Sequence, residues 1–548
     1  MTKEGPSRTE AAVSALLFGL YLLIVVALQW RGNAFRAELG GTADEAPHYV
    51  TGLLVHDYVS DGLPGKPLAY AHNFYNHYPK VALGHWPPFF YIVQAAWTLP
   101  FTPSRTSVML LMAALTALLA TALTKTIWEE FSLGAGVLAG VTLLSLTVIQ
   151  EFSSLLMSEI LLTLLVFLAT LAYGRYLDTE NWRPAVWFGF WATLGMLTKV
   201  TAIELALIPP CAVLVTRRWH LLRKFSFWLP GIMVVGIAGP WYLWVPGAQH
   251  ESVYRFGAVQ LVTPRLIETP QAWAGMLGVA CAILAIVGMV VYGQRILRGT
   301  VTGKWLAGLS VLLGAYIFRL LVGAWEARHL VTNTPVLLMF SAAGAYWLLT
   351  LPVFNSLSGR SKMAMAGVAV ASLVFLNIYK GPMKRHYGFD LAAQMLLSNP
   401  QFGKSVVLAC GRANGEGMLI SEIAMRESRP GHIVLRSTKL LANNSDWMGR
   451  NLRPLFNNQA DTMQYVEGIP AGIVVIDGEG RRSPEGRPLF EGIRQHPEKW
   501  ELLARYAPDN SSSSHEDDIL VFRLIGHERR LAGKIPAPVP SISWKFEN

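Results

Sequence analysis

The sequence predicts an all-α polytopic membrane domain followed by a small α/β domain outside the membrane. Three observations carry this prediction. The chain of 548 residues is 52% hydrophobic and only 15% charged, against about 25% charged residues in an ordinary soluble domain. Long apolar runs fill the first two thirds, and charged residues return after about Lys384. Basic residues gather in the loops between apolar runs, which is typical of cytoplasmic loops in membrane proteins.

The apolar runs are the predicted membrane helices. A span needs about 20 mainly apolar residues, because backbone N–H and C=O groups find no water in the bilayer core. Nine runs meet or approach this length: 11–29, 107–127, 133–149, 155–173, 225–245, 272–292, 305–322, 330–351 and 363–378. Two less regular runs cover 87–101, which is short, and 186–215, which is long enough for two short helices. So many runs argue against a soluble protein.

Basic loops set the predicted topology. The strongest cytoplasmic mark lies at 217–224, and two more lie at 295–304 and 360–362. If these loops and the N-terminal residues Lys3 and Arg8 all lie on the cytoplasmic side, the chain crosses the membrane about 11–13 times. We therefore expect a multi-pass protein of the inner (plasma) membrane with a cytoplasmic N-terminus. The same bias accounts for the net charge of +10, so the sequence predicts membrane lipids and no nucleic acid as partners.

The predicted domain boundary falls near residue 384. Residues 1–383 would form the membrane domain, and residues 384–548 a periplasmic or extracytoplasmic domain. Short β-branched runs at 405–409 and 472–476, a helical pattern at 416–426 and a last strand at 519–524 predict its α/β class.

The predicted external loop at 31–85 is the place where chemistry is concentrated. It carries Asp44-Glu45, then Asn76-His77-Tyr78-Pro79-Lys80, and it ends in Gly84-His85 before Trp86-Pro87-Pro88. Its aromatic residues favour the lipid–water boundary, so we expect short helices on the bilayer surface. Asp44 and Glu45 have two open interpretations, a helix cap with a first-turn acid or a functional pair.

Further motifs follow this loop in a fixed order. Leu156-Met157-Ser158-Glu159 opens a span, Leu194–Lys199 lies within a later one, Pro240-Trp241-Tyr242 closes another, and Ala327-Arg328-His329-Leu330 leads into Thr334-Pro335. As an ordered series over about residues 10 to 350, these pieces resemble the GT-C superfamily of membrane glycosyltransferases. Within it, the chain is most similar to the protein O-mannosyltransferase and lipid A aminoarabinose transferase group.

That resemblance implies a glycosyltransferase with a polyprenyl-phosphate-linked sugar donor and inverting transfer on the outer face of the membrane. Asp44 matches the family's catalytic acid and is the expected general base, with Glu45 as its neighbour in the catalytic motif and expected in a structural or supporting role. A carboxylate must take the acceptor's proton, and cations must offset the charge of the leaving phosphate. The expected phosphate-binding residues are His85, Lys80, Arg328 and His329.

The sequence departs from the family pattern at several positions. Trp86 stands where family members have Lys or His before Pro-Pro, and His48 falls near a frequent Tyr position. Glu159 replaces a frequent Asp; with His48 and His77 it completes the candidate site residues. Some relatives hold a divalent metal, so a metal is left open, as are the sugar and a lipid, glycan or protein acceptor.

Two charges inside the run at 186–215 need an explanation. A charge within a span costs about 2.5–3.5 kcal/mol on the insertion scale. Lys199 and Glu204 are badly spaced for one helical face, which predicts a helix break near 198–200.

Other functions also fit a chain of this kind. One is a transporter or flippase of a lipid-linked or polar substrate, although few charges lie near the membrane midplane and no repeat is visible. A glycan polymerase or ligase, and a non-catalytic assembly subunit, are the remaining alternatives.

Overall fold

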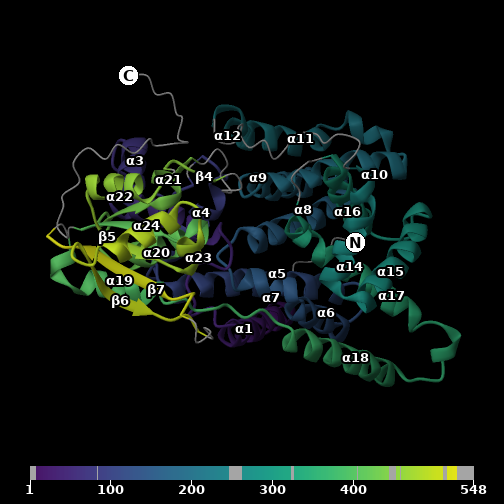
Figure 1. Ribbon diagram of the computed structural model, residues 1–548. Coiled ribbons are helices and arrows are strands. Elements are labelled where there is room, and N and C mark those ends of the chain that lie inside the picture. The colour runs from purple at the N-terminus through teal and green to yellow at the C-terminus, as the bar shows by residue number, and fades with distance from the viewer. Residues whose placement is uncertain are drawn as a thin grey trace.

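The structure is a computed structural model that describes residues 8–82, 84–245, 262–321, 326–403, 405–443, 452–456, 458–509 and 515–526. Within these ranges the chain forms a helical part and an α/β part. Figure 1 shows the α/β part, coloured green to yellow, at one end of the helical part. The predicted fold class is therefore confirmed.

Six helical stretches in the described part of the chain are long and apolar enough to cross a membrane. They are α1 (Arg8–Arg31), α5 (Arg105–Trp128), α8 (Glu159–Thr179), the α11–α12 stretch (Phe225–Trp244), α15 (Val279–Leu297) and α18 (Gly359–Tyr379). A seventh span is formed if α6 (Leu133–Ser145) and α7 (Thr147–Ser153), bent by 66°, are counted together. The chain is thus an integral membrane protein, and its number of crossings stays a prediction.

Other helices of the membrane part are shorter or broken. They include α9 (Trp182–Met196), η1 (Val200–Leu207), α10 (Ile208–Thr216), α14 (Val262–Leu277), α16 (Gly303–Leu321), η6 (Ala327–Asn333) and α17 (Thr334–Leu348). The predicted break near 198–200 is confirmed, because α9 ends at Met196 and η1 begins at Val200. Lys199 at this break pairs with Glu159 of α8 at 2.7 Å, which compensates its charge.

Several sequence predictions of helix bounds were wrong. The run at 133–149 is divided between α6 and α7, which are bent by 66°. The run at 272–292 is not one helix, because α14 and α15 meet at Gly278. The φ angle of Gly278 is +78°, a conformation that glycine adopts without strain. The run at 155–173 begins its helix at Glu159, since residues 155–158 are not helical. In each case a continuous apolar run concealed a change of backbone direction.

The loop after α1 folds into short helices, as predicted. They are α2 (Glu45–Ser60) and α3 (Pro67–His77), followed by α4 (Phe89–Thr98). The first ten residues of α2 are buried, and α2 packs against α4 and against α20 of the α/β part. The loop therefore lies between the two parts of the molecule.

The α/β part is built on a five-stranded sheet with the order β2-β1-β5-β7-β6. β1 (Val406–Cys410) pairs in parallel with β2 (Ile433–Arg436) and β5 (Ala471–Ile476), whereas β7 (Ile519–Leu524) and β6 (Trp500–Tyr506) add antiparallel. All residues of β1 and β5 are buried, as expected for central strands covered on both faces.

The remaining elements of this part connect or cover the sheet. They are α19 (Phe389–Ser398), α20 (Arg412–Arg426), α21 (Ser437–Leu440), β3 (Ala442–Asn443), β4 (Arg453–Pro454), α22 (Gln459–Gly468), α23 (Gly478–Arg482) and α24 (Gly486–Gln495). The three predicted strands and the predicted helix all form, and the sequence interpretation missed β2 and β6.

Buried ion pairs hold the α/β part against the membrane part. Arg429 binds Asp57 of α2 through two contacts of 2.7 and 2.9 Å. Glu422 of α20 accepts a hydrogen bond from Arg105 at the start of α5. Such pairs are costly to break because each leaves a buried charge uncompensated. The α/β part is therefore held in a fixed position over the loop.

Candidate active site

A cavity of about 600 Å³ lies where the loop, the membrane helices and the α/β part meet. Its lining comes from all three: Thr42, Ala43, Asp44, Pro47, Lys80, Val148, Glu151, Phe152, Met276, Glu326, Ala327, Arg328, Ala413, Arg436 and Lys439. Its size is within the range of small-molecule and cofactor sites. Charged groups of both signs and an apolar wall share this one space.

Asp44 lies at the N-cap position of α2, but its side chain makes no capping hydrogen bond. Its Oδ2 instead accepts a hydrogen bond of 3.0 Å from Arg328, whose Nε forms an ion pair of 2.7 Å with Glu326. Among the described residues, Oδ1 of Asp44 has no hydrogen-bond partner. The structure therefore favours the functional interpretation of this carboxylate over the capping one.

Glu45 occupies a different environment from its neighbour. Its side chain is fully buried and does not line the cavity. Its oxygens accept hydrogen bonds from the Gly41 and Leu156 backbone N–H groups and from Lys384, at 2.8, 3.1 and 2.8 Å. Glu45 thus joins the loop, the start of α8 and the connection to the α/β part, which makes it a positioning residue.

Two of the four predicted phosphate-binding residues line the cavity. Arg328 is one, and Lys80 is the other, with its Nζ donating a 2.8 Å hydrogen bond to the Ala413 carbonyl of the α/β part. Burial lowers the pKa of Lys80 well below its usual range, and the nearby charge of Arg436 adds to this effect. Lys80 is therefore a buried amine that a bound anion would stabilise in its charged form.

The other histidine candidates do not line the cavity. His329 accepts the Glu326 backbone N–H as part of the cap of η6, and His85 packs edge-on against the Trp86 ring. His77 donates from Nδ1 to the Gly431 carbonyl at 2.9 Å. All three have structural contacts that account for their positions.

His48 and Glu159 form a buried polar layer near Asp44. His48 contacts the Tyr91 hydroxyl at 2.9 Å and stacks on the Trp86 ring, with centroids 4.2 Å apart. Burial lowers the pKa of His48 to about 4, although the nearby charge of Asp44 opposes this. Its imidazole is therefore neutral at neutral pH. Trp86, the departure from the family pattern, contributes an aromatic surface rather than a cation.

Four charged cavity residues were missed as site residues. Arg436 ends β2, which was itself not predicted, and Lys439 follows it; Arg436 binds Glu416 at 2.7 Å. Glu326 precedes the predicted Ala327–Leu330 motif. Glu151 lies just past the end of a predicted apolar run and lines the cavity from α7. The only signal in the sequence was a charged residue near a predicted turn. Charged residues on the solvated surface give the same signal, so it does not identify a cavity residue.

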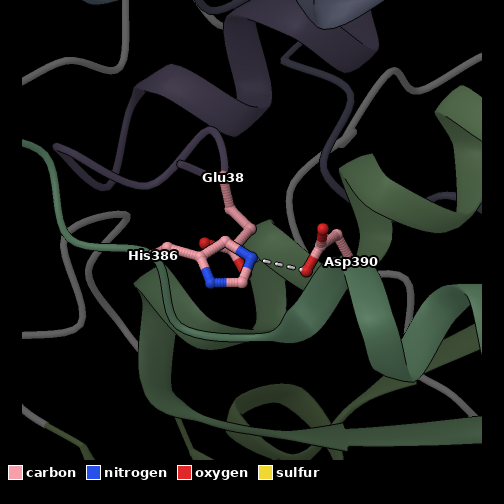
Figure 2. A group of neighbouring side chains, drawn as sticks. All are labelled: Glu38, His386 and Asp390. Carbon is pink, nitrogen blue, oxygen red and sulfur yellow. Dashed lines mark hydrogen bonds and ion pairs between the residues drawn. The ribbon is translucent and has the colours of Figure 1, made fainter. Parts of the chain in front are cut away.

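Glu38, His386 and Asp390 form a cluster whose possible ligand atoms lie within 4.8 Å of one another (Figure 2). The Glu38 carboxylate already accepts three backbone N–H groups of residues 387–389 at 2.6–2.8 Å. A 2.8 Å hydrogen bond to Asp390 raises the pKa of His386. The three side chains therefore form a hydrogen-bonded contact between the loop and the start of the α/β part. A divalent metal stays a prediction.

These features define a class of protein. A helical membrane part, an acidic residue in the loop after the first helix and an α/β part that closes a cavity over it give the chain the fold that the GT-C resemblance predicts. The resemblance seen in the sequence is thereby confirmed at the level of the fold.

Comparisons with known proteins show what the chain is similar to. The model of the dolichyl-phosphate-mannose-protein mannosyltransferase family matches residues 85–244. That segment contains Glu159 and Lys199, and it excludes Asp44, Lys80 and Arg328. A search of curated protein sequences found no significant match.

Three solved structures of two proteins illustrate the similarity of fold. ArnT from Cupriavidus metallidurans in the apo state has a TM-score of 0.58 at 15% identity, and the match covers 96% of this chain and 100% of ArnT. The same protein bound to undecaprenyl phosphate has a TM-score of 0.56 at 14% identity, with the same coverage. The oligosaccharyltransferase AglB from Archaeoglobus fulgidus, in complex with an inhibitory peptide and a dolichol-phosphate, has a TM-score of 0.52 at 13% identity, covering 91% and 74% of the two chains. At these identities the likeness establishes the fold.

Proposed function

We propose that the chain is a glycosyltransferase that moves a sugar from a polyprenyl phosphate to an acceptor on the outer face of the plasma membrane. Asp44 is the general base, and the configuration at the anomeric carbon is inverted. The observation that carries this proposal is the Asp44–Arg328 pair, 3.0 Å apart, in the wall of a cavity at the junction of the membrane part and the α/β part.

The proposed step is a single displacement. An acceptor O–H or N–H group approaches Oδ1 of Asp44, and its lone pair forms the new bond to the anomeric carbon as the bond to the phosphate oxygen breaks. The acceptor proton moves to Asp44, and the bonding electrons leave with the polyprenyl phosphate. Proton transfer and charge stabilisation at fixed positions are the contributions that such a site can make.

The cavity lining matches the two ends of such a donor. Val148, Phe152 and Met276 supply an apolar wall from membrane helices, and Lys80 and Arg328 supply positive charge for the phosphate. A lipid tail must stay in the bilayer, so a reaction on its head group has to occur at the membrane boundary. The lipid phosphates bound to ArnT and AglB agree with a donor of this kind.

A turnover assay tests the proposed reaction class. Purified protein in detergent is mixed with polyprenyl-phosphate sugars and candidate acceptors, and the released polyprenyl phosphate and the glycosylated product are both quantified. We expect equal amounts of the two and an inverted anomeric configuration by NMR. A product with retained configuration would exclude single displacement. If the protein reconstituted in lipid vesicles moved the donor across the bilayer without consuming it, the flippase would be favoured.

Replacing Arg328 by Gln should lower kcat/KM for the donor by about 10²–10³-fold. The guanidinium orients Asp44 and offsets charge on the leaving phosphate, and removing one such donor has an effect of this size. Steady-state kinetics checks the prediction, with Arg298→Gln as the matched control because Arg298 is exposed at the end of α15. Equal kcat/KM for both variants would exclude Arg328 from the reaction.

A further inference from the structure

One edge of the α/β part forms a wall of the active-site cavity. Ala413 lies just after β1, Arg436 ends β2, and Lys439 lies in α21 directly after β2. Because β1 and β2 are parallel, their carboxyl ends meet at this same edge. In open α/β sheets this is the edge at which ligands bind. The ligand-binding edge of the α/β part therefore faces the carboxylate of the membrane loop.

The charges on the cavity wall are unequally paired. Asp44 and Glu326 both contact Arg328, and Arg436 is paired with buried Glu416. In the described part of the chain, no carboxylate lies within ion-pair distance of Lys80 or Lys439. Arg328 already contacts two carboxylates, so the two lysines are the cations of this wall without a carboxylate partner among the described residues.

The energetics of the two amines favour an anionic ligand. Burial lowers the pKa of Lys439 to about 8, with the nearby charge of Arg436 acting in the same direction and Glu416 opposing it. The pKa of Lys80 is lowered for the same reasons, and Lys439 contributes to that effect. An anion between them would restore both charged forms, and amine–phosphate contacts are among the stronger hydrogen bonds.

We propose that Lys80 and Lys439, with Arg436 beside them, form a phosphate subsite shared by the membrane loop and the edge of the α/β part. This inference rests on the proposed function and gives the α/β part a direct place in substrate binding. The phosphate belongs either to the lipid donor or to the acceptor. The two lysines would bind a phosphate from either source through the same contacts, and only the molecule that carries the phosphate differs.

A purely structural role explains only part of this arrangement. Lys80 holds the Ala413 carbonyl, and Arg436 donates to the Pro79 carbonyl at 3.2 Å, so both also join the two parts of the molecule. Lys439 has no such contact among the described residues, and it still lines the cavity. Lys439 is therefore the position where binding can be tested without disturbing the contact between the two parts.

The test compares Lys439→Gln with Lys439→Arg and with the control Lys499→Gln. Lys499 lies on the same part of the molecule, pairs with Glu467 and is 49% exposed. Binding of undecaprenyl phosphate to the full-length protein in detergent is measured by titration calorimetry. Binding of glucose 1-phosphate, a soluble phosphate monoester, is then measured with undecaprenyl phosphate already bound.

Loss of one charge-assisted contact should weaken phosphate binding by about tenfold or more in Lys439→Gln. We expect Lys439→Arg to restore most of the affinity and Lys499→Gln to leave it unchanged. Weaker binding of undecaprenyl phosphate identifies the donor phosphate as the ligand. Unchanged binding of that lipid with weaker binding of glucose 1-phosphate identifies an acceptor phosphate. If Lys439→Gln weakens neither, the subsite is overturned.

The pH dependence gives a second readout. Lys439 is charged below about pH 8, so phosphate affinity in the unmodified protein should fall as the pH rises above this value. Lys80, Arg436 and Glu416 are the charged groups that face it, and the guanidinium of Arg436 does not titrate in this range. In Lys439→Arg the fall should be smaller. If sugar transfer persists while phosphate binding is independent of Lys439, only the subsite fails and the proposed function stands.

Discussion

Replacing Asp44 by Asn is expected to lower kcat for sugar transfer by about 10²–10⁴-fold, the range that general base catalysis contributes. The amide keeps the size of the side chain and can still contact Arg328, but it cannot take the acceptor's proton. Because Asp44 does not cap α2 through its side chain, the variant should fold and insert normally. Single-turnover kinetics with saturating donor separates this loss from any change in binding.

The matched control for this variant is Asp61→Asn. Asp61 lies in the same loop, just after α2, and its exposed carboxylate accepts a hydrogen bond from Tyr70. The Asp61→Asn variant should keep kcat within about twofold of the unmodified protein, because an exposed contact of this kind contributes little free energy. An Asp44→Asn protein as active as this control would remove Asp44 from the chemistry and leave the fold unaffected.

Replacing Glu45 by Gln is expected to lower the free energy of unfolding by about 3–5 kcal/mol, because it leaves Lys384 with a buried, uncompensated charge. The Lys384 side chain is only 8% exposed, and that of Glu45 is fully buried. Denaturant titration of the protein in detergent measures the effect. Asp44→Asn provides the comparison, since the neighbouring substitution should leave stability nearly unchanged.

The double variant Glu45→Gln/Lys384→Met distinguishes a charge effect from a packing effect. Removing both charges eliminates the uncompensated amine, so most of the lost stability should return. A double variant as unstable as Glu45→Gln alone would show that the hydrogen bonds to Gly41 and Leu156 dominate.

The fold was largely predictable from the sequence because its main signals are local. The lengths of the apolar runs predicted the membrane helices, and the β-branched runs predicted β1, β5 and β7. The failures occurred where tertiary contacts override composition. Gly278 divides one apolar run into two helices, and β2 and β6 lie at the sheet edges, where half-exposed residues lack a continuous apolar pattern.

The candidate site was predictable only in part. The Asp44-Glu45 motif identified the correct loop, and Arg328 and Lys80 reach the cavity from distant parts of the sequence. The sequence could not show that Asp44 and Glu45 differ in burial, because the partner of Glu45 is Lys384, which is 339 residues away. It also could not bring Lys439 to the same cavity, since that requires the docking of the α/β part.

The most direct test of this account is an experimental density map of the protein with a polyprenyl phosphate bound. We predict the phosphate within hydrogen-bond distance of Arg328 or Lys80, with the anomeric position of a sugar placed on it within reach of the Asp44 carboxylate. A phosphate bound outside this cavity, with Asp44 out of reach of the sugar position, would contradict the proposed reaction.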